Sequence, residues 1–280
     1  MPADADLQCL GPKLHTLRAH NPSFMTGAGT QSYFIGRDEL LIVDPGPDLP
    51  DQCDRLLHAI AALDARLCGI VLTHLHRDHA PAARALHART GAPIYAMAAD
   101  RKDSLQVQDL PLQPLHEGQL LMSDDGALRV VHTPGHVDNH CCFWWEAGGD
   151  LLTGDHLITG STVVIIPPYG HMGRYMASLE RLSHWPIERL LPGHGAPMQD
   201  AQGMISATLA HRRARADKVL AQLQAQSRDL ATLLACVYDD VPIHLHALAA
   251  LSLQAHLLHL QEQDLAIEDA QGWRLTASSR

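Results

Sequence analysis

Apolar runs of strand length alternate with amphipathic stretches through the first part of the chain. The strand-like runs are 39–43, 69–72 and 93–96, which are bounded by turn residues and rich in β-branched side chains. Between them, 51–63 and 81–90 carry apolar residues at helical spacing, and Gly91 is a typical stop signal for the second helix. This alternation predicts an α/β fold in which helices cover a sheet.

Four strand-like runs share a further pattern, because each ends in a short turn that is followed by a histidine or an aspartate. The turns after 128–132 and 187–191 contain both proline and glycine, where the backbone must bend sharply. The four runs are 69–72, which leads into the stretch His74 to His79; 128–132, which leads to His136; 150–154, which leads to Asp155; and 187–191, which leads to His194.

After Gly195 the alternation of strand-like and helical stretches ends, and helical patterns predominate. Three helices are expected at 205–224, 229–237 and 246–260, followed by a hairpin at 265–275 that turns at Gln271-Gly272. We therefore predict two domains, a catalytic domain at 1–204 and a small winged-helix-like domain at 205–280.

A winged helix suggests DNA binding, but the third helix does not favour it. That helix is strongly apolar and has neither arginine nor lysine with which to read bases or bind phosphates. The basic patch of this region, His211 to Arg215, lies instead on the first helix. We expect the C-terminal domain to serve packing or formation of a homodimer.

Composition adds little beyond a globular class. The 280 residues are 46% hydrophobic and 19% charged. The net charge of −10 argues mildly against a general polyanion binder, but it does not settle the substrate. No apolar run is long enough to span a bilayer, and residues 1–6 lack the features of a secretory signal. The six cysteines include no C-x-x-C pair, so we expect reduced thiols in a cytoplasmic protein.

The stretch His74-Leu75-His76-Arg77-Asp78-His79 carries the chemistry. Imidazole nitrogens and carboxylate oxygens are the ligands that borderline divalent metals prefer. A second H-x-H at His244 and His246 lacks the following Asp-His and is expected to be an ordinary pair. Together with the residues after the other strands, the motif supplies five histidines and two aspartates, too many for one tetrahedral zinc but suited to two metals.

These residues resemble the metallo-β-lactamase fold hydrolases, whose motif H-x-H-x-D-H matches His74, His76, Asp78 and His79. The resemblance covers roughly residues 14–200 and implies an αββα sandwich, and a winged-helix-bearing, lactamase-beta-2-like subgroup of the family is similar to the whole chain. Carried over by position, it implies one metal held by His74, His76 and His136, a second held by Asp78, His79 and His194, and Asp155 bridging them. Asp44 would orient a ligating histidine from behind. Zinc is the default metal, with iron or manganese possible.

The reaction expected of such a centre is hydrolysis, because a water held between two metals loses its proton near neutral pH and attacks a carbonyl or a phosphorus. We favour a small ester or thioester, of the acyl thioester or lactone type, as the substrate. In the family that this chain resembles, the thioesterase, lactonase and nuclease branches also have an aspartate at the position of Asp155. A single-strand endoribonuclease is therefore the alternative, and a non-catalytic nucleic-acid-binding protein is a distant third. Tyr169 and His171 are candidates for substrate binding because they follow a predicted ligand, and no general acid is identified.

Overall fold

The computed structural model describes residues 7–97, 107 and 109–277. The first six residues, where no secretory signal is expected, lie outside the described part. The chain forms two compact units. The first holds residues 1–133, 138–162 and 186–201, and the second holds 134–137, 163–185 and 202–280. The predicted division at 204/205 stays a prediction, and it would fall inside one long helix.

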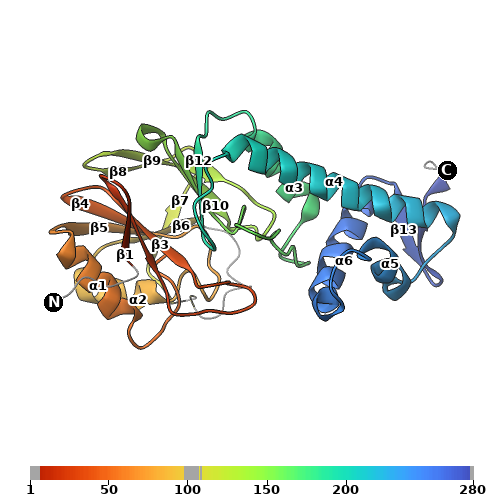
Figure 1. Ribbon diagram of the computed structural model, residues 1–280, viewed down its shortest axis with the longest axis horizontal. Helices are drawn as coiled ribbons and strands as arrows, with labels where there is room; N and C mark the ends of the chain where they lie inside the picture. Colours follow the sequence, from red (N-terminus) through yellow and green to blue (C-terminus); the bar gives the residue numbers. More distant parts are fainter. Residues whose placement is uncertain (1–6, 98–106, 108, 278–280) are drawn as a thin grey trace. The chain divides into compact units, whose positions relative to one another are not determined.

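A seven-stranded mixed sheet is the centre of the first unit (Figure 1). Its strands follow the chain in order, antiparallel from β1 to β4 and parallel from β4 to β7. They are β1 (Leu7–Gly11), β2 (Leu14–Arg18), β3 (Gln31–Ile35), β4 (Glu39–Val43), β5 (Arg66–Val71), β6 (Ile94–Met97) and β7 (Leu112–Leu115).

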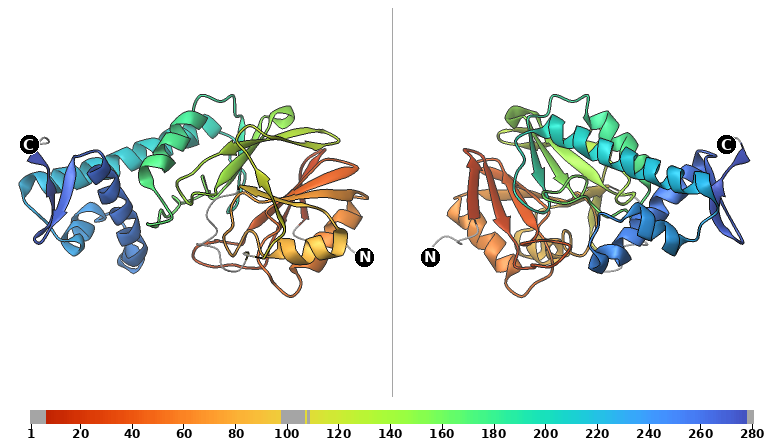
Figure 2. Two further views of the ribbon diagram at one scale, coloured as in Figure 1. Left: turned by 180° about the vertical axis from the view of Figure 1, so that it is seen from behind. Right: turned by 45° about the vertical axis from the view of Figure 1, so that its right-hand side comes forward.

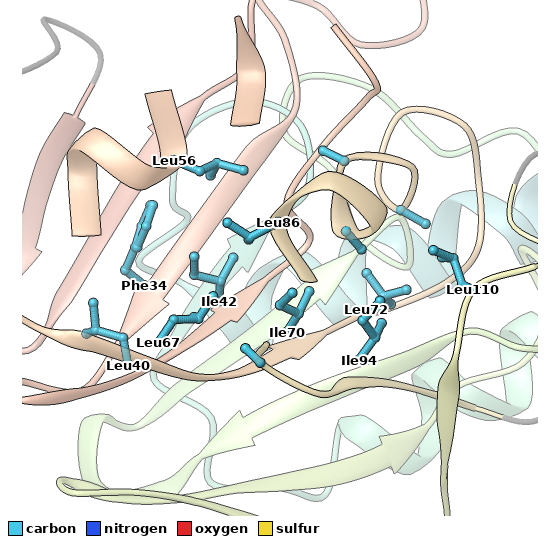
Figure 3. Packing of buried hydrophobic residues seen from close by; sticks show 14 of the residues in the cluster. Phe34, Leu40, Ile42, Leu56, Leu67, Ile70, Leu72, Leu86, Ile94 and Leu110 are labelled. Atoms are coloured by element: carbon cyan, nitrogen blue, oxygen red, sulfur yellow. The ribbon is translucent and has the colours of Figure 1, made fainter. Parts of the chain in front are cut away.

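Two helices cover one face of this sheet, α1 (Gln52–Ala62) and α2 (Ala82–Thr90). Leu56 of α1 and Leu86 of α2 pack against strand residues such as Phe34, Ile42 and Ile70 in one fully buried cluster (Figure 3). The expected stop of α2 is observed, because Gly91 caps it in the left-handed conformation that glycine adopts without strain.

A five-stranded sheet packs on the other face. Its order is β12-β11-β10-β9-β8, antiparallel except for the parallel pair of β11 and β12. Side chains of both sheets interdigitate in a second cluster, for example Val43 and Val71 with Phe143 and Leu152. The elements are β8 (Leu120–Ser123), β9 (Gly126–His132), β10 (Cys141–Trp145), the short η3 (Glu146–Gly148), β11 (Asp150–Gly154) and β12 (Arg189–Pro192).

The second unit contains helices and one hairpin (Figure 2). Its apolar cluster joins Leu223, Leu233, Leu253, Leu257 and Trp273, so the expected apolar helix is buried through packing within the unit. The elements are α3 (Met172–Leu182), α4 (Ala201–Ala225), α5 (Leu230–Val237), η4 (Ile243–Leu245), α6 (His246–Glu262), β13 (Ala266–Asp269) and β14 (Gly272–Leu275). Among the helices in the described part, none has the length and apolarity needed to cross a bilayer.

Candidate metal centre

The ends of strands deliver the predicted ligands. Because β4 and β5 are parallel, as are β11 and β12, each pair ends at one edge of its sheet, where ligands commonly bind in α/β proteins. Each predicted residue follows a strand by one to eight positions. They are Asp44 after β4, His74 to His79 after β5, His136 after β9, Asp155 after β11 and His194 after β12.

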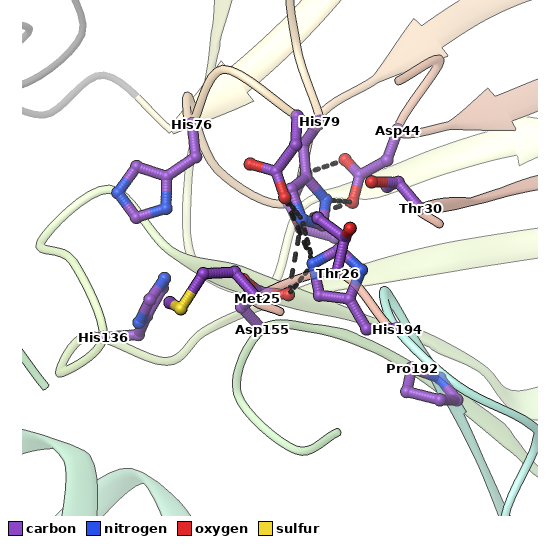
Figure 4. Close-up of polar contacts among 12 residues, drawn as sticks. Met25, Thr26, Thr30, Asp44, His76, His79, His136, Asp155, Pro192 and His194 are labelled. Carbon is purple, nitrogen blue, oxygen red and sulfur yellow. Dashed lines mark hydrogen bonds and ion pairs between the residues drawn. The ribbon is translucent and has the colours of Figure 1, made fainter. Parts of the chain in front are cut away.

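Four of these side chains converge within the first unit: Asp78, His79, Asp155 and His194. Figure 4 shows His79, Asp155 and His194 turned toward one another. Their ligand atoms all lie within 4.8 Å of one another. Nε2 of His194 is 3.3 Å from Nε2 of His79 and 3.3 Å from Oδ1 of Asp155. The same nitrogen is 3.2 Å from Oδ2 of Asp78. Imidazole and carboxylate atoms at this spacing could hold a divalent cation.

A second group shares Asp155 with the first. Within the first unit it consists of His74, His76 and Asp155, whose ligand atoms again lie within 4.8 Å of one another. The third histidine expected here, His136, belongs to the second unit. Nε2 of His74 lies 3.0 Å from Nδ1 of His76 and 3.9 Å from Oδ2 of Asp155. Asp155 is thus a member of both groups. The assignment of the seven residues as ligands remains our proposal.

Outer hydrogen bonds turn the histidine rings toward the groups. The Asp44 carboxylate, which is 2% exposed, accepts the backbone N–H of Thr73 (2.8 Å) and the Thr73 hydroxyl (2.7 Å). It also lies 2.8 Å from Nδ1 of His79, so Nε2 of that ring faces the cluster. Nδ1 of His74 is likewise engaged, by the Thr73 hydroxyl at 2.9 Å. Such outer partners fix the tautomer and orientation of metal-binding imidazoles.

Opposite charges dominate the electrostatics of the first group. Burial alone would lower the pKa of His194, but the charge of Asp155 and hydrogen bonds to Asp155 and Asp78 raise it to about 9. Burial likewise opposes the ionisation of Asp78, yet the charge of His79 and a hydrogen bond from His194 lower the pKa of Asp78 to about 2. Burial lowers the pKa of His74 well below its usual range, and the neighbouring histidines add to the effect. The centre therefore strongly favours carboxylates that carry charge, as metal ligands must.

One buried histidine of the site was missed by the sequence reasoning. His140 is fully buried, its Nε2 accepts the backbone N–H of Asp155 at 3.2 Å, and its Nδ1 lies 2.8 Å from the Thr133 hydroxyl. Because it acts through a backbone amide, residue type alone does not reveal it. Its only signal is its place directly before β10, four residues after His136.

The two predicted substrate residues lie in the second unit. His171 caps α3, since its Nδ1 accepts the backbone N–H of Arg174 at 3.2 Å, and its Nε2 is 2.9 Å from Glu262. These contacts already explain why a histidine stands there. Tyr169 is 47% exposed. A role of either residue in substrate binding stays a prediction.

The structure also distinguishes the motif His74 to His79 from the second H-x-H, at His244 and His246. His244 lies in the short η4 and is exposed, while Nε2 of His246, at the start of α6, bonds the carbonyl of Val241 at 3.0 Å. Neither belongs to a group of possible metal ligands in the part of the chain that the structure covers. The expectation of an ordinary pair at a helix start therefore agrees with their contacts.

Comparison with known proteins agrees with this architecture. Among curated relatives, an atrochrysone carboxyl ACP thioesterase from Cryptosporiopsis sp. is 29% identical, covering 82% of this chain and 70% of that protein. A beta-lactamase-like protein 2 homolog from Drosophila melanogaster is 28% identical over 87% of this chain and 86% of its own length.

Solved structures show the same fold over nearly the whole chain. A beta-lactamase domain protein from Burkholderia ambifaria has a TM-score of 0.82 at 20% identity, covering 99% of this chain and 94% of that one. A metallo-beta-lactamase family protein from Thermus thermophilus has a TM-score of 0.76 at 22% identity, covering 96% of this chain and 99% of that one. The predicted fold class is thus confirmed.

Family models match both parts of the chain. The model of the beta-lactamase associated winged helix domain matches residues 230–273, which confirms the expected winged helix. The model of the metallo-beta-lactamase superfamily matches residues 25–194, a span that includes all seven predicted ligands. The chain therefore belongs to the metallo-beta-lactamase superfamily.

Proposed function

We propose that this chain, a metal-dependent hydrolase of its superfamily, cleaves small acyl thioesters at a centre of two divalent metal ions. The observation that carries the proposal is the pair of His/Asp groups that share Asp155. Several relatives of 27–29% identity are named as acyl carrier protein thioesterases, which supports a thioester as the substrate. Zinc is the metal that we propose first, because five imidazoles and two carboxylates suit it well.

The residues divide the work as follows. Asp155 offers one oxygen to each group, since Oδ1 faces His79 and His194 while Oδ2 faces His74. Asp44 and Thr73 keep two of the imidazoles aligned. When bound, divalent metal ions would lower the pKa of water and polarise the carbonyl of the substrate. Water would be the nucleophile that cleaves the acyl bond, so no side-chain nucleophile is needed.

Cysteine chemistry does not offer a competing route. Cys141 and Cys142 are fully buried on β10, and burial raises the pKa of the Cys141 thiol well above its usual range, with the neighbouring Cys142 adding to the effect. A nucleophilic cysteine requires the thiolate. Likewise, α6 carries neither lysine nor arginine, which disfavours nucleic acid as the substrate.

A substrate panel tests the proposal. Purified protein loaded with zinc, iron or manganese is assayed on short acyl thioesters of coenzyme A, on lactones and on labelled single-stranded RNA. We expect thioester hydrolysis, with two metal ions per chain by elemental analysis. Asp155→Asn should lower kcat/KM by more than about 100-fold, since even the loss of an outer partner costs 10- to 100-fold.

The second H-x-H provides a matched control, because His244→Ala removes a histidine from a pair that is not part of the centre. This variant should keep full activity and metal content. Turnover of RNA alone would overturn the thioester proposal in favour of the nuclease alternative. Binding of a single ion at saturation would overturn the dinuclear centre.

A further inference from the structure

The segment 134–137, which contains His136, is held by backbone contacts within the second unit. The Ser178 hydroxyl donates to the carbonyl of Pro134 at 2.9 Å, and the backbone N–H of His171 donates to the carbonyl of Gly135 at 2.7 Å. Gly135 also lies directly against Tyr175, because a Cβ at this position would come within 2.3 Å of the Tyr175 Cα. The path of the backbone before His136 is thus fixed by α3.

The ring of His136 is held separately. Its Nδ1 lies 3.1 Å from the carbonyl of Val164. A carbonyl oxygen can only accept, so Nδ1 must carry the hydrogen and Nε2 keeps its lone pair. This tautomer and ring orientation are what a metal ligand needs. The position of the Val164 carbonyl therefore decides where the lone pair of His136 points.

A buried arginine holds the neighbouring peptide. Nη2 of Arg212, on α4, donates to the carbonyl of Val163 at 2.5 Å, and its guanidinium carbon lies 5.3 Å from the centroid of the Tyr175 ring. Arg212 therefore touches both parts that fix His136, the 163–164 backbone and the residue on which Gly135 packs. Its side chain joins the two.

Stability alone does not account for this arginine. Arg212 is 3% exposed, its Nε has no hydrogen-bond partner, and among the described residues no carboxylate forms an ion pair with it. Its neighbours in the same basic run differ, since Arg213 is exposed and pairs with Glu180, and Arg215 pairs with Asp240. A buried charge without a carboxylate partner is costly.

We propose that Arg212 is a positioning residue for the metal ligand His136. Arg212 fixes the backbone of Val163 and Val164. The carbonyl of Val164 then sets the tautomer and the direction of the His136 ring. This inference rests on the proposed function, because it takes His136 to be a ligand. The proposal gives α4, the helix before the winged helix, a role in metal binding, although all the proposed ligands lie before it in the sequence.

Metal binding tests the proposal without relying on turnover. Arg212→Met and Arg212→Gln both remove the contact with Val163, while Arg212→Lys keeps a cation that can donate to the same carbonyl. Arg213→Met is the matched control, one position away on the same helix but exposed. Metal affinities are measured by competition with a chelator, and the visible spectrum of the cobalt(II) form reports the ligand geometry. Urea unfolding of the metal-free variants reports the fold.

We expect Arg212→Met and Arg212→Gln to weaken one of the two metal ions by about 10- to 100-fold, the range for lost outer partners. The cobalt spectrum should change in the same variants. Arg212→Lys should restore part of the affinity, and Arg213→Met should match the wild type. If Arg212→Met does not fold, Arg212→Gln decides the result.

Three outcomes would contradict different statements. If His136→Ala loses one metal ion while Arg212→Gln keeps both affinities and the wild-type cobalt spectrum, the role of Arg212 is wrong and the proposed function stands. If His136→Ala binds both ions as tightly as the wild type, His136 is not a ligand and the dinuclear proposal itself fails. A loss of stability in Arg212→Gln with unchanged metal affinity would reduce Arg212 to a structural residue.

Discussion

At the scale of single residues, Asp44 shows how much one carboxylate organises. It stands directly after β4 with a φ of 53°, a left-handed conformation that aspartate and asparagine tolerate better than most residues. From there it binds Thr73 through two atoms and His79 through Nδ1. The Asp44 side chain thus aligns both Thr73, which directly precedes the motif, and the ring of His79 at its end.

Asp44→Asn should disturb this arrangement while keeping the backbone conformation. The remaining oxygen can still accept the backbone N–H of Thr73, but the new NH₂ group, in place of Oδ2, then faces both the Thr73 hydroxyl and Nδ1 of His79. We expect about 10- to 100-fold weaker metal binding. Competition with a chelator measures it, and Asp138→Asn, at a carboxylate outside the ligand groups, serves as the control. Unchanged affinity would show that His79 needs no fixed partner.

The residues of the site were predictable to very different degrees. His74, His76, Asp78 and His79 stand together in the sequence, and His136, Asp155 and His194 each follow a strand and a sharp turn, so local patterns reveal them. His140 and Arg212 act through peptide groups, and such contacts depend on the fold alone. Arg212 and Arg215 are read from sequence as part of a basic patch, yet both face inward on α4 and are buried.

At the scale of elements, the turn after β11 must place Asp155 in a crowded space. Gly154 has a φ of 47°, and a Cβ there would lie 2.5 Å from the Thr73 hydroxyl and 2.9 Å from Nε2 of His140. Strand β11 therefore ends in a glycine for two reasons, the backbone conformation and the lack of room. Both neighbours belong to the network that supports the ligands.

Gly154→Ala should destabilise the protein by about 3 kcal/mol, since the left-handed conformation costs an alanine roughly 1–2 kcal/mol and overpacking adds about as much. Gly91→Ala is the matched control, because Gly91 also has a positive φ but nothing within 4 Å of its Cβ position. It should lose only about 1 kcal/mol. Urea unfolding with EDTA present compares the two, and equal losses would rule out crowding at Gly154.

The elements found from sequence are those with a clear pattern. The buried strand β5 and the helices α1, α2 and α6 carry long apolar or helical runs, and each is observed within a few residues of its expected range. By contrast, β7 reads LQPL and β1 reads LQCLG, four and five residues of mixed polarity. Such edge strands depend on pairing with a neighbour, which a local pattern does not record.

At the scale of the whole molecule, the four side chains of the first ligand group couple folding to pH. The pKa of His194 in the folded chain is about 9 against an ordinary value of 6.5, and that of Asp78 is about 2 against 3.8. Histidine protonation therefore adds stability that is complete below pH 6.5 and is lost as the pH rises through 9. Aspartate ionisation adds stability above pH 3.8 that is lost as the pH falls through 2.

We therefore expect the metal-free protein to lose stability between pH 6.5 and 9, by up to about 3 kcal/mol if His194 accounts for the whole effect. A metal ion binds only the deprotonated imidazole, so stabilisation by zinc should grow over the same interval. Melting temperatures measured with EDTA and with excess zinc at a series of pH values test both trends. In His194→Gln the metal-free curve should flatten, because glutamine cannot take up the proton. A wild-type curve that rises toward pH 9 without metal, or one that falls equally in the variant, would show that the charge balance of this cluster does not govern stability.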